Sequence, residues 1–228
     1  MRNLVVLSAG LSTPSTTSKL ADDLSAAVRA QVTARGEDLT ITHVELKELL
    51  ADLTAAYSNF GAPTPLLDAA KKALTDADGL IAVTPVFQAS YSGLFKMFFD
   101  VLDKKALANL PTIIGATAGT ARHSLMLEHA VRPLMSYLGA LVMPTAVFFA
   151  TEDFGSEEGL GHDGRVRRAA QELSQHMVDT TTAVAGLAGT QTTTLNENEP
   201  QRRGATAPDQ AFTPMSEMLK NFGGNEQP

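Results

Sequence analysis

Short apolar stretches alternate with longer amphipathic stretches along most of the chain, and this alternation constrains the fold more than any other feature. The spacing predicts strands at residues 3–8, 39–44, 79–83, 111–116 and 141–149. It predicts helices at residues 15–34, 66–75, 92–103, 120–138 and 164–187, with an irregular segment at 46–62. Strands that alternate with helices form crossover units, so we expect a parallel sheet with helices on both faces.

Two arrangements of this sheet are open. If the first strand is central, the five-stranded parallel sheet forms a flavodoxin-like three-layer α/β/α sandwich, the economical topology for right-handed crossovers. The alternative is a five-strand piece of a classical dinucleotide-binding fold. The residues after the first strand lack the Gly-x-Gly-x-x-Gly motif of that fold, so we expect the first arrangement.

Composition narrows the classes of site and partner. A net charge of −7 argues against general affinity for nucleic acid, which needs clustered Lys and Arg. The absence of cysteine excludes disulfides, Fe–S clusters and thiol catalysis. His43, His162 and His176 are too scattered to predict a metal site. No apolar stretch approaches the ~20 residues of a membrane helix, and no signal-peptide core is evident, so we expect a cytoplasmic protein.

Residues 1–188 are predicted to form one domain, and residues 189–228 a flexible polar tail, because the composition changes there to Thr, Asn, Gln, Pro and charged residues. Within the tail, the segment 212–222 places apolar side chains on one helical face: Phe212, Met215, Met218, Leu219 and Phe222. This segment is either a short docking helix or a frayed terminus.

The first strand leads into a loop rich in hydroxyl residues, which opens a helix. The free N–H groups and the positive dipole end of a helix N-terminus attract anions. Four residues of this loop are therefore candidate phosphate ligands: Ser8, Ser15, Thr16 and Thr17. The alternative is an ordinary helix cap, but a cap needs only one hydroxyl.

The third predicted strand, residues 79–83, is followed by Thr84-Pro85, which sharpens its end because Pro85 fixes its own φ and restricts the residue before it. The following residues are a candidate wall for a flat ring: Pro85, Val86, Phe87 and Gln88. The alternative is a proline turn between strand and helix, with Phe87 and Tyr91 in the core.

The fourth strand is followed by small residues, which let a backbone approach a ligand closely. The candidate ligand-binding residues are Thr117, Ala118, Gly119 and Thr120, and a tight turn is the alternative. All three loops follow parallel strands and should meet at one end of the sheet. That convergence favours a binding site over three unrelated turns.

The stretch Thr84–Lys96 resembles the Thr-Pro-Val-Tyr-x-Ala-x-Tyr-Ser-Gly-x-x-Lys segment of the NAD(P)H-dependent FMN reductases, especially those that supply reduced flavin to two-component monooxygenases. Three further stretches are similar to that branch: Ser12-x-Pro14-Ser15, residues 116–120 and residues 130–134. The likeness covers residues 3–186. It implies a flavodoxin-like oxidoreductase that binds FMN and NAD(P)H, forms a homodimer or homotetramer and serves a flavin-dependent monooxygenase.

Three positions depart from the family pattern. Thr16 stands where the family often has Arg, Phe87 where Tyr is common, and Gln88 where Lys is frequent. A phosphate at the first loop would therefore rest on hydroxyls, N–H groups and the helix dipole.

The resemblance gives His129 a special position. In the branch that serves monooxygenases, a Tyr or His inserted in the helix after the third loop creates a π-bulge at a subunit interface, and residues 127–133 match that place. We therefore expect a π-bulge here, with a role in flavin exchange. The alternative is an ordinary surface or interface histidine.

The implied reaction needs no catalytic acid, base or nucleophile, because the flavin carries the redox chemistry. The predicted function is hydride transfer from NAD(P)H to FMN, with N–H groups of residues 117–120 stabilising negative charge on the flavin. Two other functions are open. One is a quinone or azo reductase with tightly bound FMN, and the other is a non-catalytic flavodoxin-like electron carrier.

Overall fold

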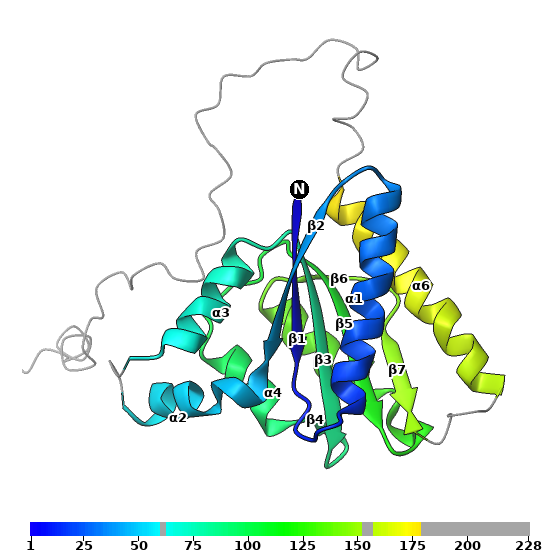
Figure 1. Ribbon diagram of the computed structural model, residues 1–228. Helices are drawn as coiled ribbons and strands as arrows, with labels where there is room; N and C mark the ends of the chain where they lie inside the picture. The colour runs from blue at the N-terminus through cyan, green and yellow to red at the C-terminus, as the bar shows by residue number, and fades with distance from the viewer. Residues whose placement is uncertain (60–62, 152–156, 179–228) are drawn as a thin grey trace, which may run out of the picture.

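A computed structural model describes residues 1–59, 63–151 and 157–178 and contains the predicted parallel sheet. Its strands lie in the order β2-β1-β3-β5-β6 (Figure 1). The bounds are Arg2–Ser8 (β1), Leu39–Glu45 (β2), Gly79–Phe87 (β3), Pro111–Ala118 (β5) and Leu141–Val142 (β6). With β1 between β2 and β3, this is the flavodoxin-like order, so the predicted fold class is confirmed.

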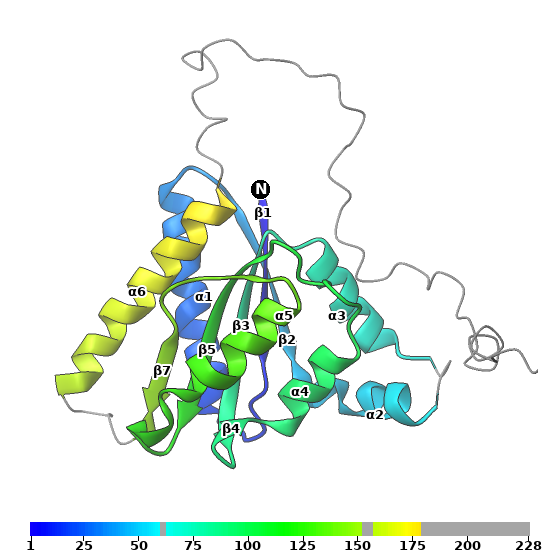
Figure 2. The same cartoon turned by 180° about the vertical axis from the view of Figure 1, so that it is seen from behind.

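Helices cover both faces of the sheet. On one face lie α1 (Thr16–Ala34) and α6 (Glu157–Met177), as Figure 1 shows. On the other lie α2 (Leu50–Ser58), α3 (Pro65–Thr75), α4 (Gly93–Asp100) and α5 (Arg132–Tyr137), seen in Figure 2. Each face has its own apolar core, because parallel strands are buried on both sides.

The sheet has seven strands rather than the predicted five. One addition arises because the last predicted strand is divided into β6 and β7 (Val147–Ala150), which pair with different parts of β5. The N–H of Met143 still donates to the carbonyl oxygen of Thr112 in β5 (2.8 Å), but other backbone groups between the two strands bond to side chains. Arg132 donates to the carbonyl oxygens of Met143 (3.0 Å) and Pro144 (3.2 Å). The carboxylate of Glu172 accepts from the N–H (2.8 Å) and hydroxyl (2.6 Å) of Thr145.

The other additional strand belongs to a hairpin, and the predicted end of the third strand is therefore wrong. β3 continues through Pro85 to Phe87 and pairs with a short antiparallel strand, β4 (Ser90–Tyr91). The β1–β3 ladder ends at Val83, so the N–H that Pro85 lacks is not needed on that side. The turn residues Gln88 and Ala89 have φ of 49° and 64°, the paired positive values of a type I′ turn.

Replacing Ala89 by glycine is expected to stabilise the protein, because an alanine at positive φ is strained. We expect the free energy of unfolding to rise by about 1 kcal/mol. Urea denaturation followed by far-UV circular dichroism measures this. The matched control is Ala26→Gly on the exposed side of α1, which should cost about 1 kcal/mol. If both variants lost the same free energy of unfolding, the conclusion that Ala89 is strained in the turn would be wrong.

The prediction of an irregular segment at 46–62 is wrong over most of its length. A 3₁₀ turn at Leu46–Leu49 leads directly into α2. Leu46, Leu49 and Leu53 are buried at a spacing of three and four residues, which is a helical pattern.

The helix predicted at 164–187 begins earlier, at Glu157, and ends at Met177. Its predicted continuation from 179 to 187 and the segment 212–222 both lie outside the described residues, as do residues 60–62.

Candidate functional site

The carboxyl end of the sheet, the N-terminus of α1 and the β3–β4 hairpin lie together at the lower edge of Figure 1. Residues of these elements line a cleft. Its volume is about 350 Å³, within the ~300–1,000 Å³ usual for ligand pockets. The three predicted loops supply most of its lining: Leu11, Ser12, Ser15, Thr16, Thr17, Pro85, Val86, Phe87, Thr117, Ala118, Gly119 and Thr151.

Four predicted residues do not line the cleft: Ser8, Gln88, Thr120 and His129. Ser8 is buried behind the loop, whereas Gln88 occupies the hairpin turn. Sequence reasoning did not name Leu11, Ser12 and Thr151 as binding residues, although they line the cleft. Thr151 directly follows β7, and the last predicted strand already contained residues 147–149, so the strand-end rule that marked the other loops would have found Thr151 had it been applied there.

The end of the cleft formed by α1 suits a phosphate. Ser15 caps the helix, since its hydroxyl oxygen accepts from the N–H of Ser18 (3.1 Å). The hydroxyls of Ser12 and Thr16 are exposed, and the first turn of α1 contains no acidic residue. N–H groups, hydroxyls and the helix dipole therefore all favour an anion there.

A chain of hydrogen bonds fixes the serine hydroxyls behind the loop that precedes α1. Ser18 donates to the Glu45 carboxylate (3.1 Å), and the oxygens of Ser8 and Ser18 lie 3.0 Å apart. Because a carboxylate only accepts, Ser18 must accept from Ser8, and the Ser8 oxygen accepts from the N–H of Gly10 (3.3 Å). Both serine protons are directed along this chain, so Ser8 orders the loop and has no proton left to donate to a phosphate.

Replacing Glu45 by glutamine is expected to tighten the binding of FMN, because it removes a negative charge close to the phosphate end. Removing such a repulsion is worth about 1 kcal/mol, or roughly fivefold in Kd. Quenching of flavin fluorescence measures the Kd. Riboflavin, which lacks the phosphate, is the control and should bind both proteins alike. An equal gain for both flavins would contradict this electrostatic account.

Buried hydroxyls connect the elements at the other end of the cleft, between β5 and the β3–β4 hairpin. The hydroxyls of Thr17 and Thr117 lie 2.7 Å apart and join α1 to the end of β5. Thr84 donates to the carbonyl oxygen of Pro85 (2.9 Å) and accepts from the N–H of Ser92 (3.1 Å), which fixes the base of the hairpin. Phe87 remains 45% exposed at the cleft mouth. The end formed by α1 fits the phosphate of FMN. The apolar wall and the small residues after β5 fit its flat ring.

The segment predicted to hold a π-bulge is π-helical over Leu127–Val131, with His129 at its centre. The N–H of Arg132 donates to the carbonyl of Leu127, five residues earlier, as a π-turn requires. Arg132 also binds Glu128 (Nε–Oε2 2.5 Å), and this hydrogen bond lowers the pKa of the Glu128 carboxyl. The role of His129 in flavin exchange stays a prediction.

Two classes of feature are absent from the described ranges. No three His, Asp or Glu side chains gather there as they do around a metal ion. None of the helices in these ranges combines the length and apolarity needed to cross a bilayer.

The chain is similar in sequence and in fold to known oxidoreductases. A solved oxidoreductase from Corynebacterium diphtheriae is 56% identical and superposes with a TM-score of 0.74, covering 78% of this chain and 97% of that one. The FMN reductase (NADPH) of Pseudomonas aeruginosa is 34% identical over 75% of this chain and 90% of its own length. The NADH-dependent FMN reductase SfnF of Pseudomonas putida is 33% identical, with coverages of 79% and 91%.

The family model of the NADPH-dependent FMN reductases matches residues 2–155. This range contains all three loops of the cleft, the β3–β4 hairpin and the π-helical segment. The chain therefore belongs to the NADPH-dependent FMN reductase family.

Proposed function

We propose that this NAD(P)H:FMN oxidoreductase binds FMN in the cleft at the end of the sheet and releases reduced FMN to a flavin-dependent monooxygenase. One observation carries the proposal: no Lys or Arg is among the described residues that line the cleft. A phosphate held by hydroxyls and N–H groups, with Glu45 behind the loop, is held weakly enough to leave.

Each part of the cleft has a role in this proposal. The N-terminus of α1, with Ser12 and Thr16, binds the phosphate. Val86 and Phe87 form a wall for the ring, and the backbone N–H groups near Ala118 and Gly119 stabilise the negative charge that grows on it. Bound FMN supplies the hydride acceptor, so the protein's task is to position two rings and exclude water.

The proposal includes a homo-oligomer in the cytoplasm, either a dimer or a tetramer. Leu11 (52% exposed) and Phe87 (45%) leave two large apolar side chains open beside the cleft. Neighbouring exposed apolar side chains are typical of surfaces that contact another protein. A second subunit over this mouth would cover them and help to enclose the ring.

Gel filtration followed by steady-state kinetics tests the proposal. We expect the purified protein to be colourless after gel filtration and to oxidise NAD(P)H only when FMN is added, with saturation in FMN. A yellow protein that reduces quinones or azo dyes without added FMN would instead support a tightly bound flavin. Failure to oxidise either nicotinamide cofactor in the presence of FMN would leave only an electron carrier.

A further inference from the structure

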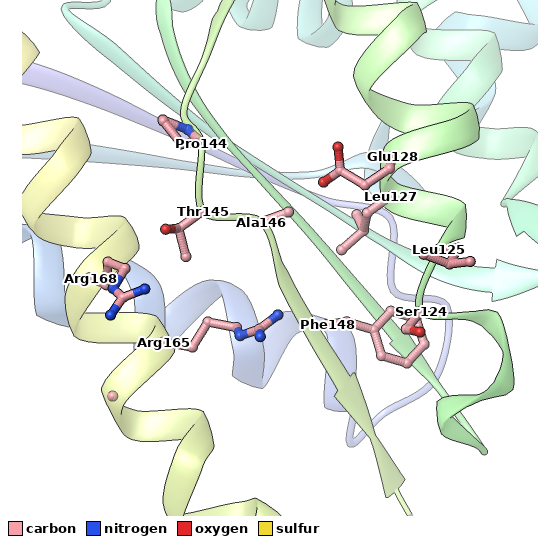
Figure 3. Close-up of a pocket in the computed structure, with 11 residues that line it drawn as sticks. Ser124, Leu125, Leu127, Glu128, Pro144, Thr145, Ala146, Phe148, Arg165 and Arg168 are labelled. Atoms are coloured by element: carbon pink, nitrogen blue, oxygen red, sulfur yellow. The ribbon is translucent and has the colours of Figure 1, made fainter.

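A second cavity lies beside β7, outside the flavin cleft, between α6 and the π-helical segment (Figure 3). Its volume is about 630 Å³, which is larger than the cleft. The β6–β7 connection forms its floor, and neither the predicted site nor the proposed hydride transfer uses it.

Among the described residues that line this cavity, the charged side chains without a bonding partner are positive. Glu128 lines the cavity, but the guanidinium of Arg132 binds both of its carboxylate oxygens. Arg165 and Arg168 line the opposite side, and neither makes a hydrogen bond or ion pair with any residue in the described part of the chain. Figure 3 shows Arg165 reaching from α6 toward Phe148, with Arg168 one turn away near Thr145.

Much of the remaining lining is apolar, although Ser124 and Thr145 also belong to it. The ring of Phe148 is partly exposed, and Leu127, Pro144 and Ala146 lie near it. Arginine pairs bind phosphate through parallel, charge-assisted hydrogen bonds, and an aromatic ring offers a stacking surface for a base. Two arginines facing an aromatic wall, in a space too large for inorganic phosphate alone, favour a nucleotide.

We propose that this cavity binds an adenine nucleotide, with its phosphates on Arg165 and Arg168 and its base against Phe148. The ligand is either the adenylate half of the hydride donor NAD(P)H or a free adenine nucleotide. The first source rests on the proposed function. Phe148 of this cavity and Thr151 of the cleft are three residues apart, or roughly 10 Å along an extended chain. A dinucleotide with its nicotinamide in the cleft can span that separation.

Isothermal titration of ADP into the FMN-free protein tests the proposal. We expect saturable binding that weakens roughly tenfold or more in the double variant R165Q/R168Q, because two charge-assisted contacts are lost. The matched control is R167Q, an exposed arginine of the same helix outside the cavity, which should bind ADP like the wild type. R165K/R168K keeps the charge and should recover part of the affinity.

Kinetics distinguish the two sources. A raised KM for NAD(P)H with unchanged kcat in R165Q/R168Q, and competition between ADP and NAD(P)H, identify the dinucleotide. An unchanged KM together with ADP binding identifies a free nucleotide. No ADP binding to the wild type, equal binding by R165Q/R168Q, or an equal loss in R167Q would overturn the proposal. FMN binding, measured separately by fluorescence quenching, should be unchanged in R165Q/R168Q, and its absence in the wild type would count against the proposed function alone.

Discussion

Replacing Gly10 by alanine is expected to weaken FMN binding by roughly 10- to 100-fold, the equivalent of about 1–3 kcal/mol of overpacking. A Cβ at this position would lie 2.1 Å from the hydroxyl oxygen of Ser15 and 3.0 Å from that of Ser18. Ser15 caps α1 and lines the cleft, so its displacement disturbs the phosphate end directly. Quenching of flavin fluorescence gives the Kd of each protein.

The control for this substitution is Gly93→Ala. Gly93 is the first residue of α4, and a Cβ there meets nothing within 4 Å. The control should bind FMN as the wild type does. A Gly10→Ala protein with wild-type affinity would show that the loop before α1 does not hold the phosphate.

The second large effect is expected in the core beneath the hairpin. Replacing Phe95 by alanine should lower the free energy of unfolding by about 3–5 kcal/mol, the usual cost for a buried phenylalanine. Phe95 is 0% exposed, and its ring centre lies 4.7 Å from that of Phe99 and 5.9 Å from that of Tyr91. Urea denaturation followed by far-UV circular dichroism measures the change.

Phe95 also links stability to the site, because Tyr91 belongs to the strand that pairs with Val86 of the cleft wall. We therefore expect Phe95→Ala to bind FMN more weakly even where it remains folded. Phe95→Leu keeps most of the volume and should cost less than about 1.5 kcal/mol. A loss below 1 kcal/mol for the alanine variant would contradict the packing described for this core.

Much of the fold could be predicted because parallel strands leave a simple pattern of apolar runs. The predictions failed where contacts with distant parts of the chain determine where a strand ends. Pro85 reads as a strand breaker, yet it lies within β3 because the neighbouring strand β1 has already ended and no ladder bond is lost. The division of β6 from β7 depends on Arg132 and Glu172, which bond to the connecting backbone from distant helices.

The position of the cleft could be predicted from the sequence, but some of its hydrogen bonds could not. The strand-end rule placed the residues around Thr16, Val86 and Ala118 correctly at one end of the sheet. It could not show that Ser8 donates its proton to Ser18, because that direction follows from the bond of Ser18 to Glu45, a carboxylate of the neighbouring strand β2. The sequence also could not predict that Arg165 and Arg168 of α6 face a cavity, because a spacing of three residues is ordinary for a solvated helix face.

The most direct test of the central claim is the initial rate of NAD(P)H oxidation at varied FMN concentration, under anaerobic conditions, for the wild type and Gly10→Ala. The placement of FMN in the cleft predicts a KM for FMN that is roughly tenfold or more higher in the variant, with nearly the same kcat, because only flavin binding is weakened. An unchanged KM with a reduced kcat, or no FMN-dependent oxidation by the wild type, would contradict it.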